Sequence, residues 1–486
     1  MAYRILTWFL RVVTRVFFRQ VEVVGLENIP AGPVIFAGNH PNSLIDPALI
    51  ITTCGRKVHF AAKDSLFKGR LMRTLLRGLG AVPLARKVEH DGKLAPAAES
   101  TPTRDPAEMA RLNDAAFDAM FDVLGDGGTI GIFPEGISHD ESHLAKLKTG
   151  AARLALGGAK KTGRPIAVVP CGLTFIHPKR FRSRVLVQYG SPLIIEHAED
   201  PEAVKRVTAE IGTALRRLTI NAPDWDTVRA LDTVRRLYQP QEISIEDRVE
   251  LARRFNTYYS AVSANPKVRE IMQRVLAYQQ KLDELGLTDR ELARDLSKLE
   301  IVVRMLRQVI LILWWLPLAV PAAPLHVPPL IFARIASSRL TPRKDVVATT
   351  KMLIGMGLVV LSYASTVAYI WWRFGPTYGL AATLLLPLSG WATLRVLDRV
   401  RLVRRAFGTL ARRFAFRREV RALRAEREQL SAAVIRVISE VKPRELEALF
   451  PPDHPDRIHE STHERAEADL DSAYDEKDRE EREDRE

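Results

Sequence analysis

The chain is organised around the stretch Phe36-Ala37-Gly38-Asn39-His40-Pro41-Asn42-Ser43-Leu44-Ile45-Asp46-Pro47. The apolar run 34–37 predicts a short buried strand that ends at Gly38. The turn residues that follow place an imidazole, His40, and a carboxylate, Asp46, at the end of this strand. An imidazole oriented by a carboxylate is typical of a general base that works near neutral pH. A lone pair of this kind is more often a hydrogen-bonded histidine and a helix-capping aspartate, so the other motifs of the chain decide its meaning.

Length and charge limit the classes of protein to consider. A chain of 486 residues is long enough for two or three domains. Its net charge is +14, although acidic residues outnumber basic ones from residue 460 onward, so the rest of the chain is more basic still. Such a body favours an anionic partner: a membrane surface, nucleic acid or a phosphorylated substrate. Two cysteines, Cys54 and Cys171, are too few for a disulfide framework and lack metal-ligand spacing, which indicates a reducing compartment.

Residues 21–220 alternate between strand-like and helix-like runs. Strands are predicted at 21–25, 34–38, 58–62, 81–84, 129–133, 166–174 and 184–189. Helices are predicted near 43–53, 66–78, 106–124, 148–160 and 202–219. This alternation predicts an α/β domain with a mixed, partly parallel sheet flanked by helices.

Four regions outside this domain are predicted to be helical or disordered. At residues 1–20, arginines lie opposite apolar residues on a helix, which suits either the membrane interface or packing on the domain itself. Residues 221–303 are predicted to be a helical region, and the sequence does not indicate its role. Residues 399–450 form a basic amphipathic helix with heptad spacing, for which local packing and a coiled-coil dimer are the alternatives. The acidic tail, 451–486, has few apolar residues and is expected to be disordered.

Residues 304–398 are predicted to be embedded in a membrane, with a soluble helical core as the alternative. The uncharged run 352–372 would span about 32 Å as a helix, against a hydrocarbon core of about 30 Å. A second apolar run completes a helical hairpin over 352–394. The segment 308–333 contains several prolines, which predicts a re-entrant or kinked element. Basic residues flank these segments, so the positive-inside rule predicts an integral membrane protein with its catalytic domain on the cytoplasmic face.

Three further strand ends carry side chains suited to a binding site. One ends in an arginine, in Gly80-Ala81-Val82-Pro83-Leu84-Ala85-Arg86, and a planar guanidinium suits a phosphate oxyanion. Another ends in a glutamate, in Ile132-Phe133-Pro134-Glu135-Gly136. The third is an apolar strand closed by proline and glycine, Val168-Val169-Pro170-Cys171-Gly172. Each stretch is weak alone, but their order after the histidine and aspartate is far more specific.

With these four blocks the chain resembles the PlsC-type superfamily of glycerolipid acyltransferases, over about residues 21–220. That family carries an Asn-His…Asp block, a Gly-x-x-x-x-x-Arg block, a Phe-Pro-Glu-Gly block and a Val-x-Pro block. The resemblance implies that His40 is the base that deprotonates the acceptor hydroxyl and that Asp46 orients His40. It also implies that the apolar strand 168–172 lines the acyl side of the site.

The resemblance also implies a set of substrate-binding residues. Arg86 would bind the phosphate of the acceptor, and Glu135 with Gly136 would lie beside it and shape the site. Lys148 could add positive charge for the phosphate, with a solvated surface charge as the alternative. The candidate substrate-binding residues are therefore Asn39, Arg86, Glu135, Gly136 and Lys148.

Two departures from the common family pattern bear on the acceptor. Five residues separate His40 from Asp46 where most of the superfamily has four, and the third block continues as Glu-Gly-Ile-Ser-His-Asp. Both variants resemble the branch that acylates glycerol 3-phosphate or dihydroxyacetone phosphate. The resemblance thus implies a membrane-bound O-acyltransferase of phospholipid biosynthesis that moves a fatty acyl chain from acyl-CoA to the hydroxyl of that acceptor. It implies no cofactor, with acyl-CoA or acyl-carrier protein as co-substrate and membrane lipids as surroundings.

Other functions remain open or are disfavoured. Acylation of 1-acyl-glycerol 3-phosphate or another lysophospholipid would use the same chemistry, and a non-catalytic membrane scaffold would not need His40 or Asp46. No nucleic-acid partner is expected, because arginines that flank membrane segments are better explained by lipid headgroups. No metal is expected at His139 and His143, because a third ligand and a metalloprotease motif are missing. A serine hydrolase is disfavoured because the sequence has no Gly-x-Ser-x-Gly elbow.

Overall fold

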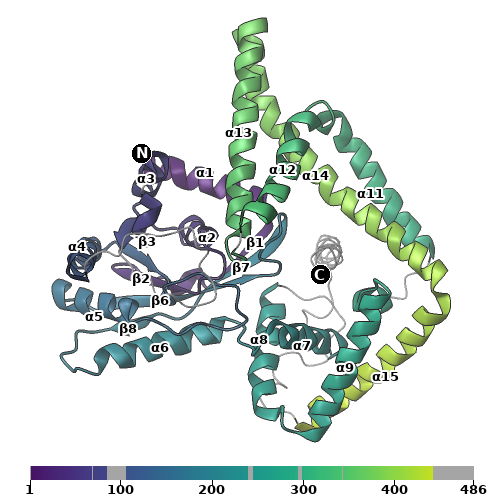
Figure 1. Cartoon of the computed structure of the whole chain (residues 1–486), viewed down its shortest axis with the longest axis horizontal. Helices are drawn as coiled ribbons and strands as arrows, with labels where there is room; N and C mark the ends of the chain where they lie inside the picture. The colour runs from purple at the N-terminus through teal and green to yellow at the C-terminus, as the bar shows by residue number, and fades with distance from the viewer. Residues whose placement is uncertain are drawn as a thin grey trace. The chain divides into compact units, whose positions relative to one another are not determined.

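The computed structural model describes residues 2–67, 69–84, 106–238, 245–293, 298–341 and 343–441. The chain divides into two compact units (Figure 1). One comprises Met1–Asn221 with Ala333–Ile354, and the other comprises Ala222–Phe332 with Gly355–Glu486. The sequence placed 333–354 in the membrane region, whereas the structure groups this segment with the α/β domain.

The first unit contains an eight-stranded mixed sheet in the order β1-β7-β6-β2-β5-β3-β4, with β8 paired to β6. β2 runs parallel to both β5 and β6, whereas β6 is antiparallel to β7 and β8. The predicted mixed, partly parallel sheet is therefore confirmed. The strands are β1 (Phe18–Val24), β2 (Val34–Gly38), β3 (Val58–Lys63), β4 (Val82–Leu84), β5 (Thr129–Ile132), β6 (Ile166–Phe175), β7 (Ser183–Tyr189) and β8 (Leu193–Ile195).

Helices cover both faces of this sheet (Figure 1). They are α1 (Ala2–Phe17), α2 (Ile45–Thr53), α3 (Arg70–Gly78), α4 (Pro106–Gly125), α5 (Gly150–Thr162) and α6 (Ala203–Leu218). Side chains of β2 alternate between the two cores: Val34 and Phe36 pack with α2, and Ile35 and Ala37 pack with α4, α5 and α6. A strand buried on both faces needs a continuous apolar run, which explains why the sequence there shows no polar alternation.

The end of the N-terminal helix and one short strand differ from the prediction. The N-terminal helix, predicted over 1–20, ends at Phe17, because the next residues form β1 and pair in parallel with β7. The short strand β8 was missed, since three residues are too few to show a period. On α1, Leu10 packs against the core while Trp8 stays 63% exposed, so this helix has a second, uncovered apolar side.

The second unit is helical and has a core of its own. α7 (Trp225–Tyr238), α8 (Ile245–Val262), α9 (Pro266–Glu284) and α10 (Asp289–Ala293) contribute to this core together with α15 (Arg417–Val441). Val420 and Leu430, two apolar residues at heptad spacing, are buried in it. Arg427, seven residues after Val420 and so at the same heptad position, donates to Asp289 at 2.8 Å, and Tyr278 donates to the same carboxylate. Of the two alternatives for this helix, the structure shows local packing.

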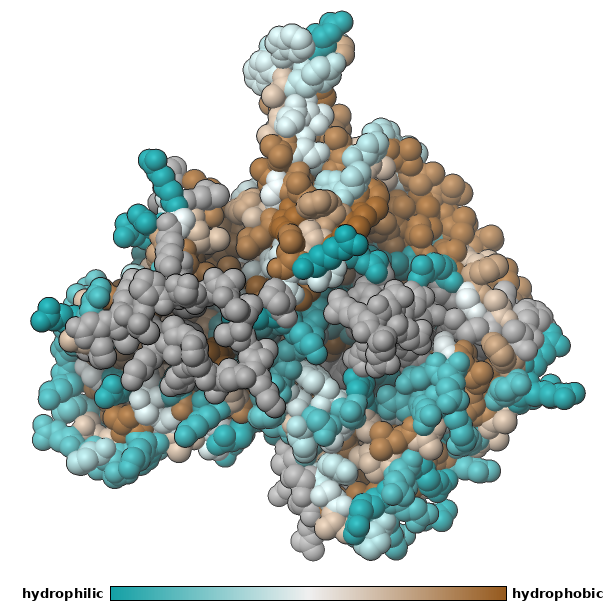
Figure 2. All heavy atoms as spheres, viewed as in Figure 1, coloured by the Kyte–Doolittle hydropathy of each residue, from teal (hydrophilic) through white to brown (hydrophobic). Residues whose placement is uncertain are grey.

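Among the described residues, three helices are long and apolar enough to cross a membrane: Val302–Ala319, Val347–Phe374 and Pro376–Gly408. They belong to α11 (Lys298–Ala319), α13 (Val347–Phe374) and α14 (Pro376–Ala415), and α12 (Ala323–Leu340) lies between the first two in sequence. The proline-rich segment breaks between α11 and α12, as its composition predicts. Figure 2 shows apolar atoms gathered over the surface of these helices, where Trp314 is 76% exposed.

The break between α13 and α14 falls at Gly375, where φ is +96°, a conformation that favours glycine. Helix α14 then continues without interruption to Ala415. The predicted boundary between the membrane region and the basic helix, at 398/399, therefore lies inside one helix.

Candidate active site

The carboxyl ends of β2 and β5 bring the first and third sequence blocks together. These strands are parallel neighbours, so the loops that follow them leave the same edge of the sheet. The His40 N–H donates to Glu135 Oε1 at 2.7 Å, and the His139 N–H donates to the His40 carbonyl at 3.1 Å. The two loops are therefore joined by one hydrogen bond to the Glu135 side chain and one between backbone groups.

The His40 and Asp46 side chains form a hydrogen-bonded pair. Their Nδ1 and Oδ2 atoms lie 2.8 Å apart, and the Asp46 side chain is fully buried. The Asn42 N–H donates to the same Asp46 oxygen at 2.7 Å. Because a carboxylate only accepts, this geometry assigns the ring proton to Nδ1 and leaves Nε2 as the basic nitrogen. The expected approach of imidazole to carboxylate is confirmed; the catalytic role stays a prediction.

The extra residue between them is taken up by a left-handed turn. Ser43 has φ of +51°, and its carbonyl accepts the Asp46 N–H at 3.3 Å, while the Asn42 carbonyl accepts the Ile45 N–H. The turn lies just before α2, so the Asp46 carboxylate reaches back to His40 from the first turn of that helix.

Aromatic packing fixes the plane of the imidazole. The His40 ring stacks on Phe133, with centroids 4.1 Å apart and planes 9° from parallel. Gly38 makes room for this arrangement, since a Cβ there would lie 3.0 Å from the Phe133 ring.

Burial dominates the electrostatics of Asp46. It raises the pKa of this carboxyl well above the ordinary value, while the Asn42 N–H acts in the opposite direction. The charges of Glu135 and Asp345 raise the pKa further, and His139 lowers it. Among the described residues, Asp46 Oδ1 has no hydrogen-bond partner, which fits a carboxylate held largely by its other oxygen.

Glu135 supports the loops around it. It is 2% exposed, and besides the His40 N–H it accepts the Ala145 N–H at 2.8 Å and a hydrogen bond from His139 Nε2. Burial acts to lower the pKa of His139, but the hydrogen bond and charge of Glu135 outweigh it, so the net shift is upward. These contacts suit a residue that shapes the site more than one that binds phosphate itself.

The other predicted substrate-binding residues fall in different places. Asn39 donates to the Leu173 carbonyl at 3.1 Å and accepts the Leu173 N–H at 2.7 Å, so both ends of its amide bind β6 and favour a positioning role. Lys148 lies over Gly136, which has φ of +77° and whose added Cβ would lie 2.8 Å from Lys148 Cδ. Arg86 lies outside the described residues.

The apolar block 168–172 is part of the core. Val168, Val169 and Cys171 are fully buried in the two clusters that pack on either face of β6. In the described part of the chain, the strand β6 contacts the loop after β2 through the hydrogen bonds between Leu173 and Asn39. A role in lining the acyl side remains a prediction.

One segment of the site was missed from sequence. Asp345 accepts a hydrogen bond from Ser138 Oγ, and Arg343 Nη2 donates to the Ser138 carbonyl at 3.1 Å. Thr349 Oγ1 donates to the Asn42 carbonyl at 3.3 Å. A signal was present: Asp345 is the sole acidic residue between Glu300 and Asp398 in the sequence.

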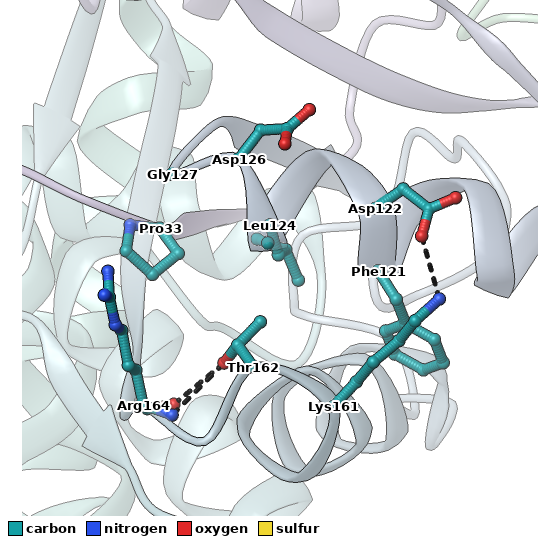
Figure 3. Close-up of a pocket in the computed structure, with 10 residues that line it drawn as sticks. Pro33, Phe121, Asp122, Leu124, Asp126, Gly127, Lys161, Thr162 and Arg164 are labelled. Atoms are coloured by element: carbon teal, nitrogen blue, oxygen red, sulfur yellow. Dashed lines mark hydrogen bonds and ion pairs between the residues drawn. The ribbon is translucent and has the colours of Figure 1, made fainter.

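A hollow of about 510 Å³ lies elsewhere on the same unit (Figure 3). Pro33, Gly127 and Arg164 line it and precede β2, β5 and β6, so it lies at the amino ends of these strands. An ion pair of 2.8 Å between Lys161 and Asp122 lies at its rim. It is therefore at the opposite edge of the sheet from His40 and plays no part in the site described here.

The described side chains were compared with the ligand sets of metal sites. In the ranges that the structure describes, no three His, Cys, Asp or Glu residues gather as a metal site. His139 is bonded to Glu135, and His143 is exposed.

Comparisons with known proteins match two families. Residues 20–174 match the family described as Acyltransferase, and residues 230–446 match the Glycerol-3-phosphate acyltransferase 2 C-terminal domain. The chain is 24% identical to Glycerol-3-phosphate O-acyltransferase 2 of Saccharomyces cerevisiae, over 75% of this chain and 64% of that protein. It is 27% identical to Glycerol-3-phosphate O-acyltransferase 1 of the same yeast, over 77% of this chain and 61% of that protein. The chain thus spans less than two thirds of the length of either relative.

Among solved structures, the chain is similar to the 1-acyl-sn-glycerophosphate acyltransferase PlsC of Thermotoga maritima. The identity is 23% and the TM-score 0.32, over 44% of this chain and 77% of that one.

Proposed function

We propose that this chain is a PlsC-type acyltransferase and that it transfers a fatty acyl group from acyl-CoA to a hydroxyl of glycerol 3-phosphate. The observation that carries the proposal is the hydrogen bond of 2.8 Å between His40 Nδ1 and the buried Asp46 carboxylate. It supplies an oriented base at a strand end shared with Glu135.

The chemistry needs one base and no covalent intermediate. His40 Nε2 takes the proton of the acceptor hydroxyl as its oxygen attacks the thioester carbonyl. The new C–O ester bond forms as the C–S bond breaks, and the imidazolium returns its proton to the leaving thiolate. Asp46 stabilises the transient imidazolium and holds the ring, which the stack on Phe133 also keeps in plane.

Glycerol 3-phosphate is favoured as the acceptor for two reasons. The five-residue spacing between His40 and Asp46 resembles the first-acylation branch of the family. The two Saccharomyces cerevisiae relatives are named for glycerol 3-phosphate, and so is the family that matches residues 230–446. Lys148 over Gly136, and Arg86, are the cations we assign to the phosphate. Dihydroxyacetone phosphate and lysophospholipids are the alternative acceptors, and they are tested beside glycerol 3-phosphate.

We also propose that the protein works at a membrane with the α/β unit on the cytoplasmic side. The three long apolar helices support the proposed membrane location. The basic residues that flank them in sequence support the proposed orientation. The exposed Trp8 and Ile5 of α1 would enter the interface. An acyl-CoA substrate and a lipid product are suited to that location.

The test is an acceptor and donor panel on the purified full chain. Acyl-CoA or acyl-carrier protein is offered with glycerol 3-phosphate, dihydroxyacetone phosphate or 1-acyl-glycerol 3-phosphate. We expect transfer from acyl-CoA to glycerol 3-phosphate, and its loss in His40→Ala but not in the matched variant His143→Ala, whose side chain is exposed. Faster acylation of the 1-acyl acceptor would move the proposal to the second acylation. No transfer to any acceptor, with lipid composition in cells unchanged by His40→Ala, would favour a scaffold.

A further inference from the structure

A segment far along the chain contacts the loop that carries Glu135. Asp345 is 7% exposed and accepts from Ser138 Oγ. Arg343 joins the pair: its Nη2 lies 2.7 Å from Asp345 Oδ2 and donates to the Ser138 carbonyl at 3.1 Å. Ser138 follows Glu135 by three residues, so this cluster restrains the loop that supports the His40 backbone.

The same segment contacts the turn between His40 and Asp46. Thr349, which is 3% exposed, donates from Oγ1 to the Asn42 carbonyl at 3.3 Å. Asn42 in turn donates its N–H to Asp46 Oδ2 at 2.7 Å. Ala348, the residue before Thr349, is fully buried in the core cluster that includes residues of α2. A shift of Thr349 would therefore move Asn42, the residue whose N–H holds the Asp46 carboxylate.

We propose that Asp345 and Thr349 are positioning residues of the acyltransferase site, with Asp345 fixing the Glu135 loop and Thr349 fixing the turn before Asp46. The segment 343–349 follows α12 and includes the first residues of α13, so a part of the chain that the α/β pattern does not include completes the site. The inference rests on the proposed function, because its readout is acyl transfer.

Two features argue against a segment that merely covers the sheet. A buried carboxylate and a buried hydroxyl lose solvation, and apolar side chains would cover a core at lower cost. Here both polar groups point at site loops, one at Ser138 and the other at Asn42. The Asp345 charge also acts on the dyad, since it raises the pKa of Asp46.

The first test uses Thr349 in the full chain, in native membranes. Thr349→Val keeps the shape of the side chain and removes the donor, so kcat should fall about tenfold, with KM for both substrates within about twofold. Thr349→Ser restores the hydroxyl and should recover most of kcat. Thr350→Val makes the same change one residue away and should leave kcat unchanged. Thermal unfolding measures the amount of folded enzyme in each variant, because a loss of folding would lower that amount and leave kcat per folded enzyme unchanged.

The second test uses the charge of Asp345. Asp345→Asn should lower kcat and move the acid limb of its pH profile to lower pH, because a charge that raises the Asp46 pKa has been removed. The other charged groups that act on Asp46, which are His40, Glu135 and His139, are left in place. Asp122→Asn, at the opposite edge of the sheet, should leave both the rate and the profile unchanged.

The outcomes separate the two proposals. If His40→Ala is inactive while Thr349→Val and Asp345→Asn keep the wild-type kcat and pH profile, the positioning role is wrong and the proposed function stands. If His40→Ala is as active as the wild type, the proposed function itself fails. The positioning role is supported by a shifted pH profile in Asp345→Asn together with a loss of kcat per folded enzyme in Thr349→Val that Thr349→Ser reverses. A purely structural role would change the amount of folded enzyme and leave kcat and the pH profile unchanged.

Discussion

His40 Nδ1 lies 2.8 Å from Asp46 Oδ2 although five residues separate the two in sequence. The left-handed φ of +51° at Ser43 closes the turn between them, and the first turn of α2 delivers the carboxylate. The longer spacing is thus accommodated by backbone geometry, and the dyad is kept.

Replacing Asp46 by asparagine should remove the charge while keeping the shape. The amide could donate to Nδ1 and favour the wrong tautomer, so kcat should fall by on the order of 10²–10⁴-fold, with KM for glycerol 3-phosphate little changed. Steady-state kinetics of the purified variant measure both constants. A matched change at Asp122, which is exposed and paired with Lys161, should have no effect. Retention of kcat in Asp46→Asn would show that the dyad is structural.

Removing a charge near Asp46 should shift the acid limb of the pH profile of kcat in a direction set by the sign of that charge. The deprotonated His40–Asp46 pair is the active form, so kcat falls as pH decreases and the pair takes up a proton; a negative charge near the pair, which raises the pKa of Asp46, moves this loss to higher pH. His139 lowers this pKa, so His139→Gln should move the acid limb to higher pH, opposite to Asp345→Asn. The charge of Glu135 is left in place in both variants. Profiles of kcat from pH 4 to pH 9, about the range in which carboxyl and imidazole groups titrate, measure the shifts. Two shifts of the same sign would contradict this electrostatic account.

The turn at Ser43 should tolerate glycine and resist branched side chains. Ser43→Gly accepts positive φ freely and should keep activity, whereas Ser43→Val should destabilise the turn by roughly 1–2 kcal/mol and lower kcat. Thermal unfolding in detergent and initial rates measure the two effects. Equal activity in the glycine and valine variants would mean that the left-handed turn does not control the dyad.

Gly38→Ala should disturb the orientation of the His40 imidazole through the Phe133 ring. The new Cβ would lie 3.0 Å from the Phe133 ring, which must shift, and the ring of His40 stacks on it. We expect kcat to fall about tenfold through misorientation of the base. Gly125→Ala is the control, because a Cβ there meets nothing within 4 Å. Equal rates for the two alanine variants would show that the stack on Phe133 does not hold the base.

Much of the α/β unit follows from sequence for a local reason. β2 is buried on both faces, so its apolar run is unbroken, and α4 and α5 have clear limits in a glycine-rich end and in Gly163. The approach of His40 to Asp46 was also predicted, because both lie in one short loop. Such features depend on neighbours in the chain.

What escaped prediction depends on distant partners. The start of β1 at Phe18 is decided by pairing with β7, more than 160 residues away, which no local pattern records. The sequence does not indicate that the amide of Asn39, which the family resemblance assigns to substrate binding, bonds Leu173 of β6. Asp345 and Thr349 contact Ser138 and Asn42 only in the folded chain. The apolar runs around them in sequence predict a membrane region, so no local pattern indicates these contacts.

The most direct measurement is the rate of CoA release by the purified full chain with acyl-CoA, in the presence and absence of glycerol 3-phosphate. The proposed function predicts release that depends on the acceptor, with 1-acyl-glycerol 3-phosphate formed in equal amount. It predicts no such release in His40→Ala and an unchanged rate in His143→Ala, since that second imidazole is exposed. Acceptor-dependent release that persists in His40→Ala would contradict the assignment of His40 as the base.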